Sequence, residues 1–96
     1  AMRLMVEGDV TAARAGVVGA IARLDALRDQ IVPRAQLAVE SALAAYAAGR
    51  GTLVGVIEAA TSLWNSRSEL VMAETAVAQS RSRLARAVGR TETTPP

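Results

Sequence analysis

The sequence contains no cysteine and no histidine, and these two absences exclude most of the chemistry that small proteins perform. Without cysteine there is no disulfide scaffold and no thiol nucleophile. Without either residue type there is no Cys/His zinc site, no Ser-His-Asp triad and no Glu-x-x-His pair of a di-iron bundle. We therefore expect no catalytic residue, no cofactor and no metal site, and the protein is not expected to be an enzyme.

Aromatic and turn-forming residues are also scarce. The 96 residues include one Trp, one Tyr and no Phe, with only three Pro and seven Gly, although 51% of the chain is hydrophobic. Alanine, valine and leucine supply nearly all of this apolar content, which suits thin, closely spaced helices better than a thick globular core. So few turn residues argue against a fold of many strands. The composition predicts an all-α protein.

Neither charge nor hydropathy indicates a nucleic-acid surface or a membrane-spanning helix. The formal net charge is +2, a small excess in which every basic residue is an arginine. Arg83, Arg86 and Arg90 share one helical face and could meet phosphate, but no aromatic residues are interleaved with them. No uncharged apolar run approaches the ~18 residues that span a bilayer. The first residues lack a signal-peptide pattern, so we expect a fragment of a longer protein.

One dense break divides the chain. Residues 8–48 and 53–88 are mostly helix formers, and Gly49, Arg50, Gly51 and Thr52 lie between them. Gly49 can end the first helix in a left-handed conformation, and Thr52 can cap the second. We predict one domain, a helical hairpin over residues 1–90. Its helices are expected at about residues 4–48 and 53–89, with a turn at 49–52 and a disordered tail at 91–96.

Apolar residues recur every seven positions in both predicted helices, which indicates an antiparallel coiled coil. In the second helix these residues are Val56, Leu63, Leu70, Val77 and Leu84, beside Ala59, Ser66, Ala73, Ser80 and Ala87. In the first helix they are Val10, Val17, Leu24 and Ile31, beside Ala13, Ala20 and Leu27. This register places Tyr46 level with Val56, Val39 with Leu63, and Val32 with Leu70. It also places Glu74 level with Arg28 as a weak surface pair.

Pro33 interrupts the first helix. It removes one backbone hydrogen bond and costs about 3 kcal/mol inside a helix. Beyond it the apolar positions move by one residue, to Val32, Ala35, Val39, Ala42 and Tyr46. Because the apolar spacing resumes at once, we favour a kink over a break into two helices.

A second apolar line on the second helix cannot be covered by the hairpin partner alone. It comprises Ile57, Trp64, Val71, Ala78 and Ala85. A two-helix layer does not build its own core, so we expect the chain to oligomerise into a helical bundle. Trp64 is interpreted as a helix-packing residue rather than a platform for a ligand.

The segment from Ala45 to Leu70 resembles the periplasmic hairpin of TolC-like outer-membrane efflux factors. The matching residues are Tyr46, Gly49, Thr52, Val56, Ile57, Glu58, Ala59, Leu63 and Trp64. Residues 31–35, with Pro33, are similar to a segment of the heavy-metal and cation branch, and residues 85–89 to the usual C-terminal ending. The chain departs from the family at Gly55, often Asp, and at Gly51, often basic.

The resemblance implies a C-terminal, second-repeat hairpin in the periplasmic portion of an outer-membrane protein. Three protomers would form an α-barrel, and residues 49–52 would form the tip that docks to a periplasmic adaptor (membrane fusion) protein. An inner-membrane pump would supply the energy for export of metal ions or drugs. Tyr46 and Glu58 would lie at the tunnel entrance. Tyr46 could instead close the hairpin seam, and Glu58 could be a first-turn acid that the helix dipole favours.

Two other functions remain to be weighed against the channel. A self-contained secreted helical hairpin of the Trp-x-Gly type needs its Trp in the turn, whereas Trp64 lies within a predicted helix and is followed by Asn65 and Ser66. A basic helical nucleic-acid binder would lose affinity steeply with salt. We expect no specific binding to nucleic acid.

Overall fold

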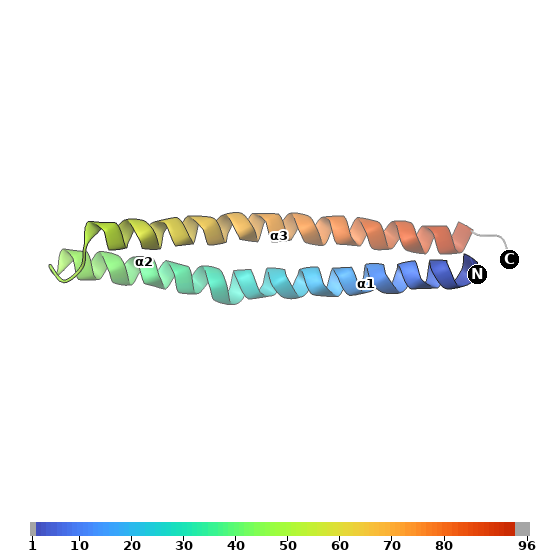
Figure 1. Cartoon of the computed structure of the whole chain (residues 1–96), viewed down its shortest axis with the longest axis horizontal. Coiled ribbons are helices and arrows are strands. Elements are labelled where there is room, and N and C mark those ends of the chain that lie inside the picture. The colour runs from blue at the N-terminus through green and yellow to red at the C-terminus, as the bar shows by residue number, and fades with distance from the viewer. Residues whose placement is uncertain (1, 94–96) are drawn as a thin grey trace. The chain divides into compact units, whose positions relative to one another are not determined.

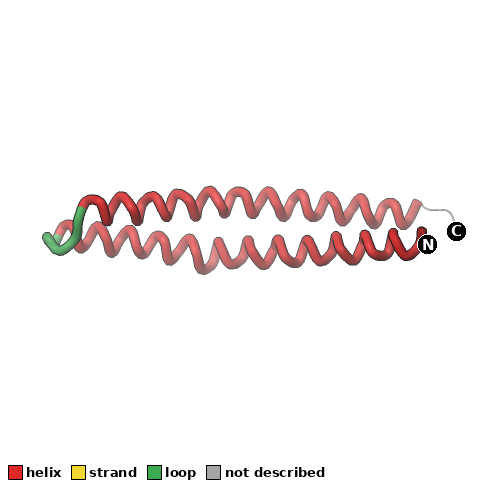
Figure 2. The backbone as a smooth tube through the Cα atoms, viewed as in Figure 1, coloured by secondary structure: helices red, strands yellow, loops and turns green. Residues whose placement is uncertain are grey.

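The computed structural model describes the backbone of residues 2–93 and the side chains of residues 8–90, and the described chain is all-α as predicted. Helix α1 spans Met2–Ala26, a π-helical turn η1 spans Leu27–Ile31, α2 spans Val32–Ala47 and α3 spans Leu53–Thr93. Figure 2 shows the single turn that interrupts the helical path. No strand occurs within residues 2–93.

The chain forms two compact units. One comprises residues 25–72, in which η1 and α2 run antiparallel to the first half of α3 (Figure 1). This unit contains the turn and confirms the predicted helical hairpin. The other unit pairs α1 up to Leu24 with α3 from Ala73 onward. Helix α3 thus contributes one half to each unit.

The apolar line predicted for α3 is confirmed along its whole length. Every residue of the line is half-buried or buried, from Val56 to Ala87. The most buried of them are Ala73, Val77 and Ala87, with 4%, 6% and 2% of their surface exposed. The line follows an uninterrupted alternation of three- and four-residue steps, which is the spacing that keeps one helical face against a partner.

The first half of the chain follows the predicted line with two corrections. The line is confirmed from Val10 to Leu27, and Leu27 is fully buried. Ile31, predicted as the next member, is 42% exposed, so that prediction was wrong. After the shift by one residue, Val32, Ala35, Val39 and Ala42 are half-buried as predicted. Tyr46, predicted as the last member, is 48% exposed, and Ala45 is half-buried in its place.

The π turn is the physical reason for the shift. The backbone N–H of Val32 donates to the carbonyl of Leu27, five residues earlier instead of the four of an α-helix. One extra residue is therefore accommodated between two line members, Leu27 and Val32. Ala26, Ile31 and Val32 keep helical backbone angles, so the helix is not broken. Pro33 lies in the first turn of α2, where a missing N–H is best tolerated.

The predicted end of the second helix is also corrected. We expected Gly89 to stop it and the tail to begin at residue 91, but α3 continues to Thr93. A glycine stop needs a left-handed backbone, and within the described residues only Gly49 has a positive φ. Gly89 remains helical, at the modest cost of glycine in a helix. Residues 94–96 of the predicted tail lie outside the described part of the chain.

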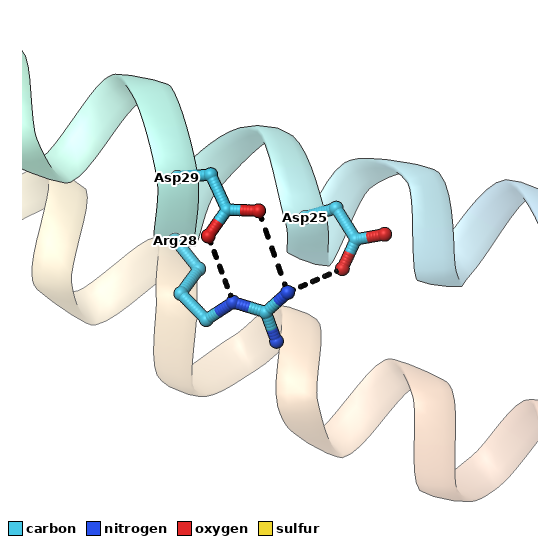
Figure 3. Close-up of polar contacts among 3 residues, drawn as sticks. All are labelled: Asp25, Arg28 and Asp29. Carbon is cyan, nitrogen blue, oxygen red and sulfur yellow. Dashed lines mark hydrogen bonds and ion pairs between the residues drawn. The ribbon is translucent and has the colours of Figure 1, made fainter.

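Arg28 forms its ion pairs within the π turn region rather than with Glu74. Its Nη2 lies 2.8 Å from Asp25 Oδ1, and its Nε lies 3.0 Å from Asp29 Oδ1 (Figure 3). The hydrogen bond and charge of Asp29, followed by the charge of Asp25, raise the pKa of Arg28. All three side chains are at least half exposed, so these pairs contribute little to stability.

We expect Leu27→Ala to lower the free energy of unfolding by about 2 kcal/mol or more, because Leu27 is fully buried. The matched control is Leu37→Ala, at a side chain that is 61% exposed, for which we expect a much smaller loss. Urea unfolding followed by circular dichroism measures both. Equal losses would show that Leu27 is not the better-packed leucine.

Candidate functional site

The turn between α2 and α3 ends the first helix with a Schellman motif. The N–H of Arg50 donates to the carbonyl of Ala45 at 2.8 Å, and the N–H of Gly49 donates to that of Tyr46 at 3.1 Å. Gly49 adopts the left-handed conformation that this motif needs, with φ of 73°. The prediction that Gly49 stops the first helix is confirmed.

Gly51 folds back against the last turn of α2. Its N–H donates to the Ala45 carbonyl at 3.0 Å. A Cβ at this position would lie 3.0 Å from the Tyr46 nitrogen and 3.1 Å from the Ala45 Cβ. The approach is close enough that a side chain at residue 51 would displace backbone. The same approach covers Ala45, and this explains why Ala45 ends the apolar line while Tyr46 stays half exposed.

Thr52 begins the second helix as predicted. Its Oγ1 accepts a hydrogen bond from the N–H of Gly55 at 3.0 Å, which is the N-cap interaction at the third helical position. Gly55 has no side chain to return the bond, so the capping box is half formed. Turn and cap together use only five residues between Ala47 and Leu53. The tip is therefore short and held by backbone hydrogen bonds.

The turn and the first residues of α3 present both charged and apolar side chains to solvent. Arg50 and Glu58 are exposed. Glu58 lies beyond the first turn of α3, so its alternative interpretation as a first-turn acid was wrong. Beside them are two exposed residues that the sequence reasoning missed, Leu53 and Val54, with 54% and 62% of their surface accessible. Their signal was present in the sequence, because both are apolar residues in a first helical turn that lie off the seven-residue line.

The second apolar line on α3 is uncovered. Ile57, Trp64 and Val71 are 55%, 72% and 61% exposed, and Ala78 and Ala85 are exposed as well. This agrees with the expectation that the hairpin partner cannot cover both lines. Trp64 is not buried by the described residues 8–90, so the packing role predicted for it needs a further helix.

The three arginines noted in the sequence gather in the other unit. Arg83, Arg86 and Arg90 line an open groove together with small residues. The remaining lining residues are Asp9, Ala12, Ala13, Gly16, Ser80, Ala87 and Gly89. No aromatic side chain lines this groove, so it lacks the stacking surface of a single-strand binding site.

Two negative findings concern the described residues alone. No helix among them has the length and hydropathy to cross a membrane. No cluster of three or more acidic side chains among them could hold a metal ion.

We expect Gly49→Ala to destabilise the chain by about 1 kcal/mol or more, because alanine is strained at a positive φ. Gly19→Ala is the control: Gly19 is helical, a Cβ there would meet no atom within 4 Å, and alanine should stabilise by up to ~1 kcal/mol. Thermal unfolding at equal chain concentration compares them. Changes of the same sign would contradict the assignment of the stop to Gly49.

Comparison with known proteins agrees with this geometry. Residues 2–90 match the family model described as outer membrane efflux protein. No curated protein and no solved structure matches the chain. The family match covers nearly all of the described residues, including both helices and the turn. The chain therefore belongs to the outer membrane efflux protein family.

Proposed function

We propose that this chain is a periplasmic α-barrel hairpin of an outer-membrane efflux channel. Membership of the outer membrane efflux protein family supports a role in transport rather than catalysis. In this role the hairpin forms part of the tunnel, the tip meets a periplasmic adaptor, and an inner-membrane pump supplies the energy. The exported substrates in this proposal are metal ions or drugs. The chain itself performs no chemical step.

The observation that carries the proposal is the uncovered apolar line of α3. A helix that buries one line against its partner and exposes a second line of Ile57, Trp64 and Val71 is suited to a wall of helices, where each helix has neighbours on two sides. Burial of one large apolar side chain contributes roughly 1.5–3 kcal/mol. Three such residues, spaced seven apart, would provide a continuous contact for the next hairpin of the barrel.

The competing function is that of a self-contained secreted hairpin, and it requires the opposite arrangement, with the apolar lines buried. Such a protein has to keep its apolar lines covered by its own two helices. Trp64 is 72% exposed and lies within α3 instead of in the turn. This exposure favours the channel over the self-contained hairpin.

We expect Trp64→Glu to weaken self-association of the chain by about 10-fold or more, since the lost burial is worth at least ~1.5 kcal/mol. Asn65→Glu adds the same charge to an exposed site of α3 that lies about 100° around the helix from Trp64, away from the second apolar line, and should leave association nearly unchanged. Sedimentation equilibrium gives both constants. A wild-type chain that remains monomeric at high concentration would overturn the barrel assignment.

The tip is proposed as the adaptor-docking site. Residues 49–52 are joined by backbone hydrogen bonds to the last turn of α2, Arg50 is exposed, and the exposed apolar residues Leu53 and Val54 follow directly after the turn. An arginine beside apolar side chains is a composition enriched at protein interfaces. Tyr46 and Glu58 are proposed to face the tunnel entrance. Both are exposed, as an entrance residue has to be.

We expect the double substitution Arg50→Glu, Leu53→Glu to reduce binding of the purified adaptor of the same efflux system by about 10-fold or more. Neither side chain forms the backbone hydrogen bonds of the turn, so the helical signal should stay at the wild-type level. Arg67→Glu, at an exposed site farther along α3, is the control for charge reversal alone. Wild-type affinity in the double variant would remove the docking proposal.

A further inference from the structure

The π turn joins two helical segments whose apolar positions are out of phase by one residue. The line of α1 ends at Leu24 and Leu27, and an unbroken α-helix would continue it through residues 31, 34, 38 and 41. The structure instead continues it through residues 32, 35, 39 and 42, which are half-buried. The five-residue step from Leu27 to Val32, closed by the bond from the Val32 N–H to the Leu27 carbonyl, absorbs the difference.

The alternative phase would also place apolar residues at the seam. Without the π turn, Ile31 and Ala38 would replace Val32 and Val39, while Arg34 and Ser41 would replace Ala35 and Ala42. An arginine can lay its aliphatic stem along a seam and keep its charge in water, and a serine can bond to its own helix. The alternative phase is thus poorer in apolar contacts, but it has no buried charge that would forbid it.

Pro33 discriminates between the two phases. In the π form it lies directly behind the five-residue bond of the π turn, so it is not preceded by a regular α-helical turn. In an unbroken α-helix the same proline would be an interior residue, with a lost hydrogen bond and a clash against the carbonyl of Asp29. That penalty corresponds to a factor of about 100 in an equilibrium constant, the conversion of ~3 kcal/mol.

We propose that the Leu27–Ile31 π turn is a two-state phase selector for α2, and that Pro33 holds it in the Val32/Val39 phase. If the π turn converted to a regular α-helical turn, α2 would rotate about its axis by roughly 100°, the angle between successive residues of an α-helix. Within residues 25–72, this rotation would turn one row of α2 side chains away from α3 and bring another row against it. The selector therefore determines which side chains of the segment leading to the tip face outward.

Paired cysteines in this cysteine-free chain can report each phase. The register predicted from the sequence places Val39 level with Leu63, and both are half-buried. Val39→Cys with Leu63→Cys is therefore chosen to report the observed phase, and Ala38→Cys with Leu63→Cys to report the alternative one. We expect the 39/63 pair to form its intrachain disulfide faster than the 38/63 pair under a fixed concentration of oxidised glutathione. Adding Pro33→Ala should accelerate the 38/63 pair by about 10-fold or more, within the 100-fold limit set by the proline penalty.

The matched control combines Pro33→Ala with deletion of Gln30. This deletion restores the four-residue step between Leu27 and Val32, so an unbroken α-helix keeps Val39 at the seam and only one phase remains. In the variant that combines Pro33→Ala with the deletion, the 38/63 pair should form its disulfide at the rate seen in the chain that keeps Pro33 and Gln30. The proposal is overturned if Pro33→Ala leaves the 38/63 rate unchanged, or if it raises the rate equally in the deletion control. Loss of the helical circular dichroism signal in Pro33→Ala would also overturn it, because both proposed phases are helical.

Discussion

Two antiparallel helices contact each other along only one face of each helix, and the other features of the chain follow from this restriction. Each helix can bury a single apolar line, and the steps of three and four residues along α3 supply that line from Val56 to Ala87. Leu27, Ala73, Val77 and Ala87 are the buried apolar side chains among the described residues, and three of them are no larger than valine. A seam of such small side chains stabilises the pairing only modestly.

The same restriction explains the surface. Apolar residues off the shared line, such as Ile57, Trp64 and Val71, remain more than half exposed. In a channel wall they would meet the next hairpin, which is why their exposure and the family match support one another. The tip follows from local backbone chemistry instead. Its Schellman motif and its threonine cap need no tertiary support, and they present Arg50, Leu53 and Val54 to solvent.

The π turn is the one place where the two helices do not follow a single repeat. A residue inserted between Leu27 and Val32 could have rotated the rest of the first helix off the seam. The π turn absorbs this residue, and Val32, Ala35, Val39 and Ala42 stay half-buried. Pro33 fits immediately behind it, since the start of a helical segment best tolerates a residue without an N–H.

The sequence by itself determined what depends on local rules and on periodicity. The all-α class, the stop at Gly49, the cap at Thr52, the apolar line of α3 and the shift near Pro33 all follow from residue types and their spacing. The resemblance read from Tyr46 to Trp64 also led to the family that the chain belongs to. These features were predictable because a capping bond or a seven-residue repeat involves neighbours in the sequence.

Only the tertiary structure decided how the shift is made and which residues end the lines. Ile31 is exposed because the π turn carries the line past it, and Tyr46 is exposed because Gly51 packs against Ala45. Arg28 pairs with Asp25 and Asp29 instead of Glu74, and α3 continues through Gly89. Packing of α2 against α3 decides which row of the first helix is buried, and no single segment encodes that choice. The contacts of Arg28 and Gly51 are local, but the apolar repeat alone does not specify them.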